Sequence, residues 1–259
     1  LVYSFADGDG HDKKLLGGKG ANLCEMTQIG INVPPGFVIT TAACLEYLEA
    51  DALPEALMSQ VSEEIQRLQA ATGRTFGAGE NPLLVSVRSG SALSMPGMMD
   101  TILNLGLNAE TLQGEIRQTH DPRFGYDAYR RFIQLFGKVA MGVPDEVFDA
   151  EFEAVKQAAH VTTDIGLSAD DLREISDRFL RVFQEHTGRP FPEDPFEQLE
   201  IAIKAVFGSW MGKRAVDYRR EFKITPEMAN GTAVNVCTMV FGNRGNDSAT
   251  GVGFTRNPG

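Results

Sequence analysis

Two cationic side chains lie among small residues, in settings that suit the binding of phosphate groups. Lys19 stands within the glycine-rich segment LLGGKGANL, residues 15–23, and Arg88 opens the run RSGS, residues 88–91. Glycines let backbone N–H groups approach a phosphate closely, a lysine adds a mobile cation, and a guanidinium can bind two phosphate oxygens at once. Each residue also has an ordinary reading, as a solvated lysine in a turn or an arginine paired with a carboxylate. For Arg88 the two readings are evenly balanced on the residues alone.

The glycine-rich segment matches none of the standard nucleotide motifs. A Walker A loop would need Ser or Thr where Gly20 follows the lysine, and glycine where Lys13 stands. The run DGDGHDK at residues 7–13 is not a dinucleotide fingerprint either, because Lys13 occupies its third glycine position. The segment therefore indicates phosphate binding only weakly, and a plain turn is the commoner reading.

The run MPGMM at residues 95–99 follows the arginine after a short polar stretch. Pro-Gly suits the two central positions of a type II turn, and methionines can close over an irregular apolar body such as a purine. Methionines also fill gaps in a core, which composition alone favours. The glycine-rich segment 242–249 could fold over phosphates as a lid, although such segments are more often flexible turns.

Composition limits the classes of protein to consider. The 259 residues are 42% hydrophobic and carry a formal net charge of -11, which fits a globular protein and argues against a general nucleic-acid coat. No apolar run approaches the length of a membrane span, and the start LVYSFADGDG lacks the basic and apolar regions typical of a secretory leader, so we expect a cytoplasmic protein without a membrane partner.

The cysteines and histidines suggest neither a disulfide framework nor a metal site. Cys24, Cys44 and Cys237 form no CxxC pair and predict reduced, mostly buried thiols. The histidines lack metal-ligand spacing and are interpreted as surface residues: His11, His120, His160 and His186.

Hydrophobic periodicity predicts strands near both ends of the chain. Residues 37–40 and 83–87 are short apolar runs with strand character. Residues 232–241 and 251–255, separated by a glycine-rich loop, suggest a hairpin. In this reading Arg88 lies just beyond the end of a buried strand.

Helical periods dominate from about residue 109 to 212, where strand patterns nearly vanish. One helix of this block has Ser168 and Asp171 as a capping box. Two earlier helices are predicted, one capped by Thr41 and one running from Pro54 to a stop at Gly73. The order of elements indicates an α+β fold with a helical insertion.

With these residues in view, the chain resembles the N-terminal nucleotide-binding domain of the pyruvate, phosphate dikinase family. The matching stretches span essentially the whole chain in order: LLGGKGANLCEM, VPPGFVITT, LLVSVRSGSALSMPGMMDTILNLGLN, FGYDAYRRFIQLFG, AVFGSW, GTAVNV, MVFGN and GVGFTRNP. The third of these is highly specific. The related phosphoenolpyruvate synthases share the Gly-Gly-Lys-Gly and Val-Arg-Ser elements but differ where PGMMDT stands here. The dikinase family is therefore the better match.

The resemblance implies an ATP-grasp-like fold that binds ATP and Mg²⁺ between two subdomains. Residues 1–108 and 195–238 would form the first subdomain, residues 109–194 a helical insertion, and residues 239–259 the start of a truncated second subdomain. The family's acidic magnesium ligands lie beyond residue 259, so no metal ligand is assigned. The isolated chain is accordingly expected to be inactive.

The resemblance also implies a reaction in which ATP, phosphate and pyruvate become AMP, pyrophosphate and phosphoenolpyruvate. A phosphohistidine domain and a pyruvate-binding domain, both absent here, would complete it, and the full-length enzyme would be a homo-oligomer. By similarity, Lys19 and Arg88 are catalytic and hold the ATP phosphates. Further nucleotide contacts are implied for Gly97, Thr101, Ile102, Arg131 and Cys237. At the adenine edge the family has glutamine where this chain has Cys237, which lacks an amide to bond the base.

Two alternatives remain open. The chain could be the corresponding part of a phosphoenolpyruvate synthase or another ATP-grasp phosphotransferase. It could also be a folded interaction module that binds no nucleotide and performs no catalysis. Titration with ATP separates this last class from the others.

Overall fold

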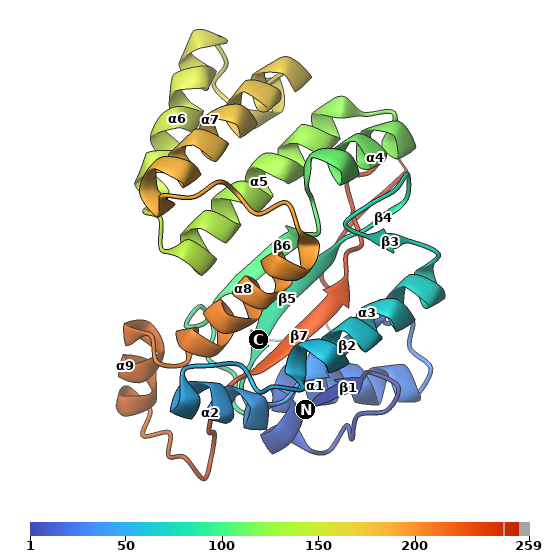
Figure 1. Cartoon of the computed structure of the whole chain (residues 1–259), viewed down its shortest axis with the longest axis vertical. Helices are drawn as coiled ribbons and strands as arrows, with labels where there is room; N and C mark the ends of the chain where they lie inside the picture. Colours follow the sequence, from blue (N-terminus) through green and yellow to red (C-terminus); the bar gives the residue numbers. More distant parts are fainter. Residues whose placement is uncertain (246, 254–259) are drawn as a thin grey trace.

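The computed structural model describes residues 1–245 and 247–253. In this structure helices surround an antiparallel sheet (Figure 1). The strands of this sheet are β1 (Val2–Ser4), β2 (Gly36–Ile39), β5 (Val85–Gly90), β6 (Thr101–Leu105) and β7 (Ala233–Thr238). They lie in the order β1-β2-β7-β5-β6, and each neighbouring pair is antiparallel. Outside this sheet, β3 (Thr75–Phe76) and β4 (Pro82–Leu83) pair in parallel. The combination confirms the predicted α+β class.

The register of the sheet separates an apolar face from a mixed face. Residues in register share a face, because successive side chains of a strand point to opposite sides. One face carries a fully buried row across four strands: Phe37, Val236, Val87 and Ile102. The other face carries a mixed row across the same strands: Val38, Asn235, Arg88 and Thr101. The mixed row thus aligns two residues that the sequence predicts to bind nucleotide.

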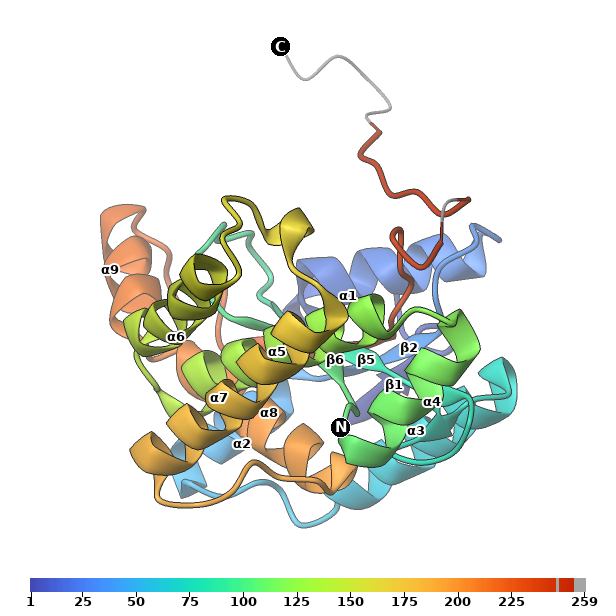
Figure 2. The same ribbon diagram turned by 90° about the horizontal axis from the view of Figure 1, so that it is seen from above.

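Helices cover both faces of the sheet (Figure 2). α1 (Lys13–Gln28) packs on the face of the mixed row, where its apolar residues form a small cluster with Val38. The larger core lies against the apolar face and includes residues of α2 (Thr41–Ala50), α3 (Leu57–Thr72) and α8 (Pro195–Ser209). The short helix α9 (Lys213–Glu221) follows α8 in the chain. The guanidinium carbon of its Arg219 lies 3.9 Å from the ring centre of Trp210, the residue directly after α8.

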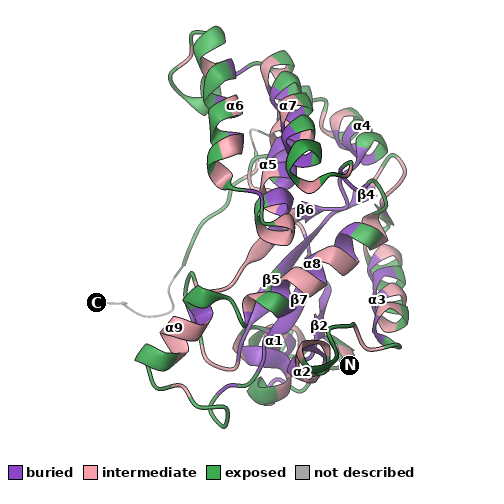
Figure 3. Ribbon diagram, turned by 60° about the vertical axis from the view of Figure 1, so that its left-hand side comes forward, coloured by how far each residue is buried: buried purple, intermediate pink, exposed green. Residues whose placement is uncertain are grey.

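A group of helices lies between β6 and α8 in the chain: α4 (Ala109–Thr119), α5 (Pro122–Met141), α6 (Asp145–Ala158) and α7 (Ala169–Thr187), with a 3₁₀ turn at Asp164–Gly166. Buried phenylalanines hold this group together, with Phe132, Phe136 and Phe183 all contacting Phe191. Figure 3 shows that buried residues run along β5 and β7 and continue into α5. None of the helices in the described ranges is long and apolar enough to cross a membrane.

Several local predictions are confirmed. Ser168 and Asp171 form the predicted capping box at the start of α7, and Gly73 ends α3 in the left-handed conformation. Cys24 and Cys44 are buried free thiols, and Cys237 is a half-buried one. The four histidines are all exposed.

Three predictions about helix starts are wrong by one to several residues. Thr40 rather than Thr41 caps α2, because the Thr40 hydroxyl accepts from Ala43 N–H at 3.3 Å. The predicted helix from Pro54 begins at Leu57, after a turn closed by the Leu57 N–H and the Pro54 carbonyl. α1 already begins at Lys13, so the glycine-rich segment 15–23, for which a plain turn is the commoner interpretation, lies inside a helix.

The strand predictions need two corrections. The run 83–87 is divided between β4 and β5, and β5 continues to Gly90, so Arg88 lies within a strand rather than beyond its end. The hairpin prediction is also wrong, because β7 pairs with β2 and β5. Residues 251–253 form no strand, and residues 254–255 lie outside the described residues.

Candidate functional site

A break in α1 at Gly17 creates a helix N-terminus beside the sheet. Gly17 has φ 69° and ψ 161°, a region of backbone space open essentially to glycine alone. A Cβ at this position would lie 1.9 Å from the carbonyl oxygen of Gly90, so glycine is what lets α1 approach β5. The helix resumes at Gly18, whose N–H donates to the Ser91 carbonyl at 2.8 Å. The N–H groups that follow, and the helix dipole, favour an anion at this end.

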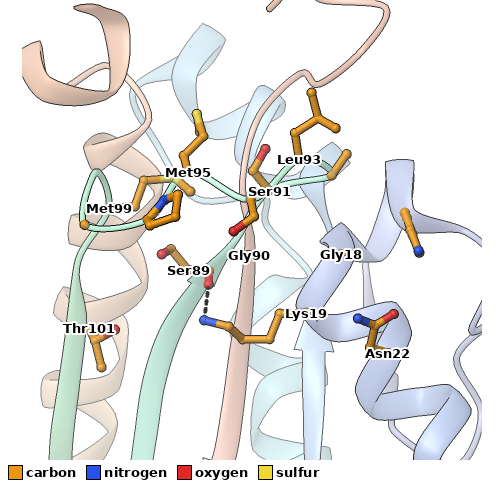
Figure 4. A pocket seen from close by; sticks show the side chains of 15 residues that line it. Gly18, Lys19, Asn22, Ser89, Gly90, Ser91, Leu93, Met95, Met99 and Thr101 are labelled. Carbon is orange, nitrogen blue, oxygen red and sulfur yellow. Dashed lines mark hydrogen bonds between the residues drawn. The ribbon is translucent and has the colours of Figure 1, made fainter. Parts of the chain in front are cut away.

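Lys19 reaches from the resumed helix to the end of β5. Its Nζ donates to the Ser89 carbonyl at 3.0 Å, as Figure 4 shows, which leaves two of its three N–H donors for a ligand. Burial lowers the pKa of Lys19 and the nearby Arg88 guanidinium lowers it further, while Cys237 acts in the opposite direction. Lys19 is exposed as a whole, and its ammonium, held by the Ser89 carbonyl beside a second cation, is stabilised when an anionic ligand binds.

Arg88 is exposed and lies on the mixed face of β5, in register with Asn235 and Thr101. Within residues 1–245 and 247–253, no carboxylate oxygen lies within 4.0 Å of its guanidinium nitrogens. The ion-paired reading of this residue is therefore not what the described part of the chain shows. Its guanidinium remains available to a ligand.

Two pockets meet at Lys19, which lines both of them. The first has a volume of about 600 Å³, and polar groups of α1, β5, β6 and the segment between these two strands line it: Lys13, Lys19, Asn22, Ser89, Ser91 and Thr101. The second has a volume of about 430 Å³ and a more apolar lining: Lys19, Leu23, Val33, Arg88, Leu103 and Cys237. Together they suit a ligand with an anionic part and an apolar part.

Five of the predicted site residues line these pockets. Gly97 and Thr101 lie at the first pocket, Arg88 and Cys237 at the second, and Lys19 at both. Residues separated by more than two hundred positions in the sequence are thus gathered on one side of the sheet.

The other two predicted residues are not brought to the pockets by their side chains. Ile102 is 0% exposed and belongs to the apolar row, so its side chain points into the core. Arg131 lies on α5, lines neither pocket, and its Nε donates to Asp127 Oδ2 at 2.9 Å. Spacing along the chain could not distinguish these two from the other five, since their positions depend on strand alternation and helix placement.

The Cys237 thiol is neutral at physiological pH. Burial raises its pKa to about 11, although the charges of Arg88 and Lys19 act to lower it. A neutral thiol offers only a weak hydrogen-bond donor to a ligand in the second pocket.

The segment with the methionines is anchored to α8 and α9. Gly97 has φ 72° and the Met98 N–H donates to the Met95 carbonyl at 3.2 Å, which confirms the predicted type II turn. Met95 is buried with Trp210, so this methionine fills a core. Met95 and Met99 also line the first pocket, and in Figure 4 Lys19, another residue of its lining, lies below them.

A salt bridge further fixes this segment. Arg214 of α9 donates to the Gly97 carbonyl at 3.3 Å and to Asp100 Oδ1 at 3.0 Å. α9 therefore fixes the position of the segment around Gly97, which forms part of the wall of the first pocket.

Sequence reasoning missed several polar residues of the site. Lys13 and Asn22 line the first pocket, and Asn235 lies fully buried in the mixed row. Asn235 had a detectable signature, since it is the polar residue inside the apolar strand AVNVCT. The others had none, because their convergence depends on the break at Gly17.

The described residues place no carboxylate in the lining of either pocket. They contain no group of three or more His, Cys, Asp or Glu side chains placed to hold a metal ion. The polar lining of the first pocket consists of ammonium, amide and hydroxyl groups, whereas Mg²⁺ prefers carboxylate and phosphate oxygens.

Comparisons with known proteins identify the family of this chain. The family described as "Pyruvate phosphate dikinase, AMP/ATP-binding domain" matches residues 13–74 and 51–259. The chain is 59% identical over 259 residues to a pyruvate, phosphate dikinase of Entamoeba histolytica and 50% identical over 259 residues to that of Clostridium symbiosum. These alignments cover 100% and 99% of the chain but 29% of the length of each relative. The chain therefore belongs to the AMP/ATP-binding domain family of the pyruvate, phosphate dikinases.

Proposed function

We propose that this chain is the nucleotide-binding part of a pyruvate, phosphate dikinase and binds ATP across the two pockets that meet at Lys19. The observation that carries this proposal is the position of Lys19, at a helix N-terminus and between a polar and a more apolar pocket. The phosphates lie beside the helix N-terminus at Gly18, between Lys19 and Arg88. The base lies against the apolar residues of the second pocket, such as Leu23 and Leu103. Lys19 and Arg88 steady the negative charge of the transferring phosphoryl group.

The same proposal includes the complete reaction. ATP phosphorylates a histidine on another domain, and the full enzyme converts ATP, phosphate and pyruvate into AMP, pyrophosphate and phosphoenolpyruvate. The dikinase names of the relatives support this over a phosphoenolpyruvate synthase. The proposal also includes an ATP-grasp-like arrangement. Its first subdomain comprises residues 1–108 and 195–238, its helical insertion residues 109–194, and its second subdomain begins with residues 239–259. A cytoplasmic location and a homo-oligomeric enzyme are part of the same proposal.

Magnesium enters this proposal only with the nucleotide. Because the described residues lack a suitable carboxylate group, Mg²⁺ would arrive bound to the phosphates of ATP. The protein's own contribution is to supply cations, hydroxyl groups and backbone N–H groups around those phosphates.

Arg88→Ala should weaken the binding of ATP by at least about tenfold, because it removes a charge-assisted hydrogen-bond donor from the second pocket. Calorimetric titration of the chain with ATP and Mg²⁺ measures this. Arg220→Ala is the matched control, since it removes the same charge from an exposed position on α9 where Arg220 pairs with Asp217. Equal losses of affinity in the two variants would mean that only net charge matters. No binding by the unmodified chain would favour a non-catalytic interaction module instead.

Incubation of the chain with ATP and Mg²⁺ should produce no phosphohistidine. The four histidines are exposed, and none lines either pocket: His11, His120, His160 and His186. Antibody detection of phosphohistidine checks this, with ATP binding confirmed in the same sample. Phosphorylation of any of these histidines would contradict the assignment of the acceptor to another domain.

A further inference from the structure

Asn235 is an unusual residue for its place in the fold. It lies in β7, the middle strand of the sheet, and is 0% exposed. Asparagine is depleted in strands, and burying an amide costs free energy unless its hydrogen bonds are made. A residue of this kind at the centre of a sheet needs a physical reason.

The amide of Asn235 is bonded on one side only. Its Nδ2 donates to the Arg88 carbonyl at 3.3 Å, while Oδ1 has no hydrogen-bond partner among the described residues. The orientation is fixed by chemistry, because the opposite orientation would set two acceptor oxygens against each other. Asn235 is thus tied to the backbone of the residue whose guanidinium lines the second pocket.

Two glycines make room for this amide. A Cβ at Gly20 would lie 2.9 Å from Asn235 Oδ1, and a Cβ at Gly90 would lie 2.6 Å from Nδ2. The amide therefore fills the space between α1 and β5. Lys19 immediately precedes Gly20, and it is bonded to Ser89, which precedes Gly90.

We infer that Asn235 is a positioning residue that sets the separation of α1 and β5, and with it the placement of the Lys19 ammonium relative to Arg88. It acts through these two cations and does not line either pocket. Two successive carbonyls of β5 hold the two side chains in place. The Arg88 carbonyl accepts a hydrogen bond from Asn235, and the Ser89 carbonyl accepts one from Lys19. A leucine has a similar branched shape but makes no hydrogen bond, so it would not fix the strand to a carbonyl. This inference rests on the proposed ATP site.

Affinity measurements on matched variants test the inference. Asn235→Leu should weaken ATP binding by about tenfold, since misplacing binding groups by a fraction of an ångström is costly. Val236→Ala is the control, because Val236 is the neighbouring buried residue of β7 on the opposite face, against Phe37 and Val87. Val236→Ala should lower the stability of the fold, because it removes buried methyl groups. The affinity of the folded chain for ATP should stay within about twofold, since Val236 packs on the face of β7 opposite to Asn235. Unchanged ATP affinity in Asn235→Leu would overturn the inference.

A second measurement does not depend on ATP. In Asn235→Leu nothing fixes the separation of α1 and β5, so the Lys19 ammonium should become more hydrated and its pKa should rise from its lowered value. The side-chain carbon resonances of Lys19, followed by NMR as the pH is raised, report this pKa in the chain without nucleotide. An unchanged titration would show that Asn235 does not control the surroundings of Lys19 and would overturn the inference. If the titration shifts but no variant or parent chain binds ATP, the proposed function fails while the positioning role stands.

Discussion

Lys19→Met should lower the affinity of the chain for ATP by about 100-fold, the largest effect expected of any single side chain in the site. Lys19 is the residue that both pockets share, and the Ser89 carbonyl holds its ammonium at the end of β5, where it can meet the phosphates. Its removal also leaves the α1 N-terminus without its neighbouring cation. Calorimetric titration with ATP and Mg²⁺ measures the loss.

The pH dependence of ATP binding provides a second readout of Lys19. The ammonium is the form that binds phosphate, and burial followed by Arg88 lowers its pKa. Affinity should therefore be greatest below this lowered pKa and decline as the pH rises through it, at a lower pH than for an ordinary lysine. Lys19→Met should abolish this decline.

Two further measurements complete the test: the stability of the Lys19→Met variant and the ATP affinity of a variant of a neighbouring lysine. Because burial disfavours the ammonium, Lys19→Met should leave the free energy of unfolding unchanged or raise it. Lys14→Met is the matched control, since Lys14 is exposed on the same helix and lines neither pocket. Comparable losses of affinity in both variants would refute a specific role for Lys19.

Gly17→Ala should destabilise the fold by roughly 3 kcal/mol or more and remove ATP binding from the molecules that remain folded. The backbone conformation of Gly17 is one that alanine scarcely adopts, and the added Cβ would meet the Gly90 carbonyl oxygen at 1.9 Å. The Gly90 oxygen is a backbone atom and a Cβ is fixed rigidly to its own backbone, so relief requires α1 to move away from β5. Such a movement would separate Lys19 from Ser89 and Arg88.

Gly73→Ala isolates the backbone part of this effect. Gly73 also has a positive φ, 66°, but a Cβ there would find nothing within 4 Å. The substitution should cost only the left-handed strain, about 1–2 kcal/mol, and leave ATP binding intact. Chemical denaturation and calorimetry distinguish the two variants. Similar behaviour of both would show that the approach of α1 to β5 is unimportant.

Local sequence was sufficient for the features that depend on neighbours in the chain. The helical stripe of α7 with its Ser168 cap, the Gly73 stop and the Pro96-Gly97 turn all follow from residues within a few positions of one another. The positions of Lys19 and Arg88 at a common site came from their match to a family pattern, which the structure then explains by the mixed row and the break in α1.

Features that depend on distant pairing could not be predicted in this way. Residues 88–90 are polar or glycine and do not resemble a strand, yet they extend β5 because Arg88, Ser89 and Gly90 find partners in β7. The hairpin interpretation of residues 232–255 failed for the same reason, since nothing local specifies β2 and β5 as the neighbours of β7. The close approach of Gly17 to Gly90 is likewise invisible until the two segments are placed together.

The central position of β7 has a consequence for the order in which the molecule assembles. β7 is the last strand of the described chain, yet it lies between the β1-β2 pair and the β5-β6 pair, and its Val236 is about 200 positions from Phe37 beside it. During synthesis these two pairs emerge early and keep unpaired edges until residues 233–238 leave the ribosome, a period in which edge-to-edge association is a hazard. Because Asn235 arrives with β7, the chain completes its nucleotide site only in the final step of forming the sheet.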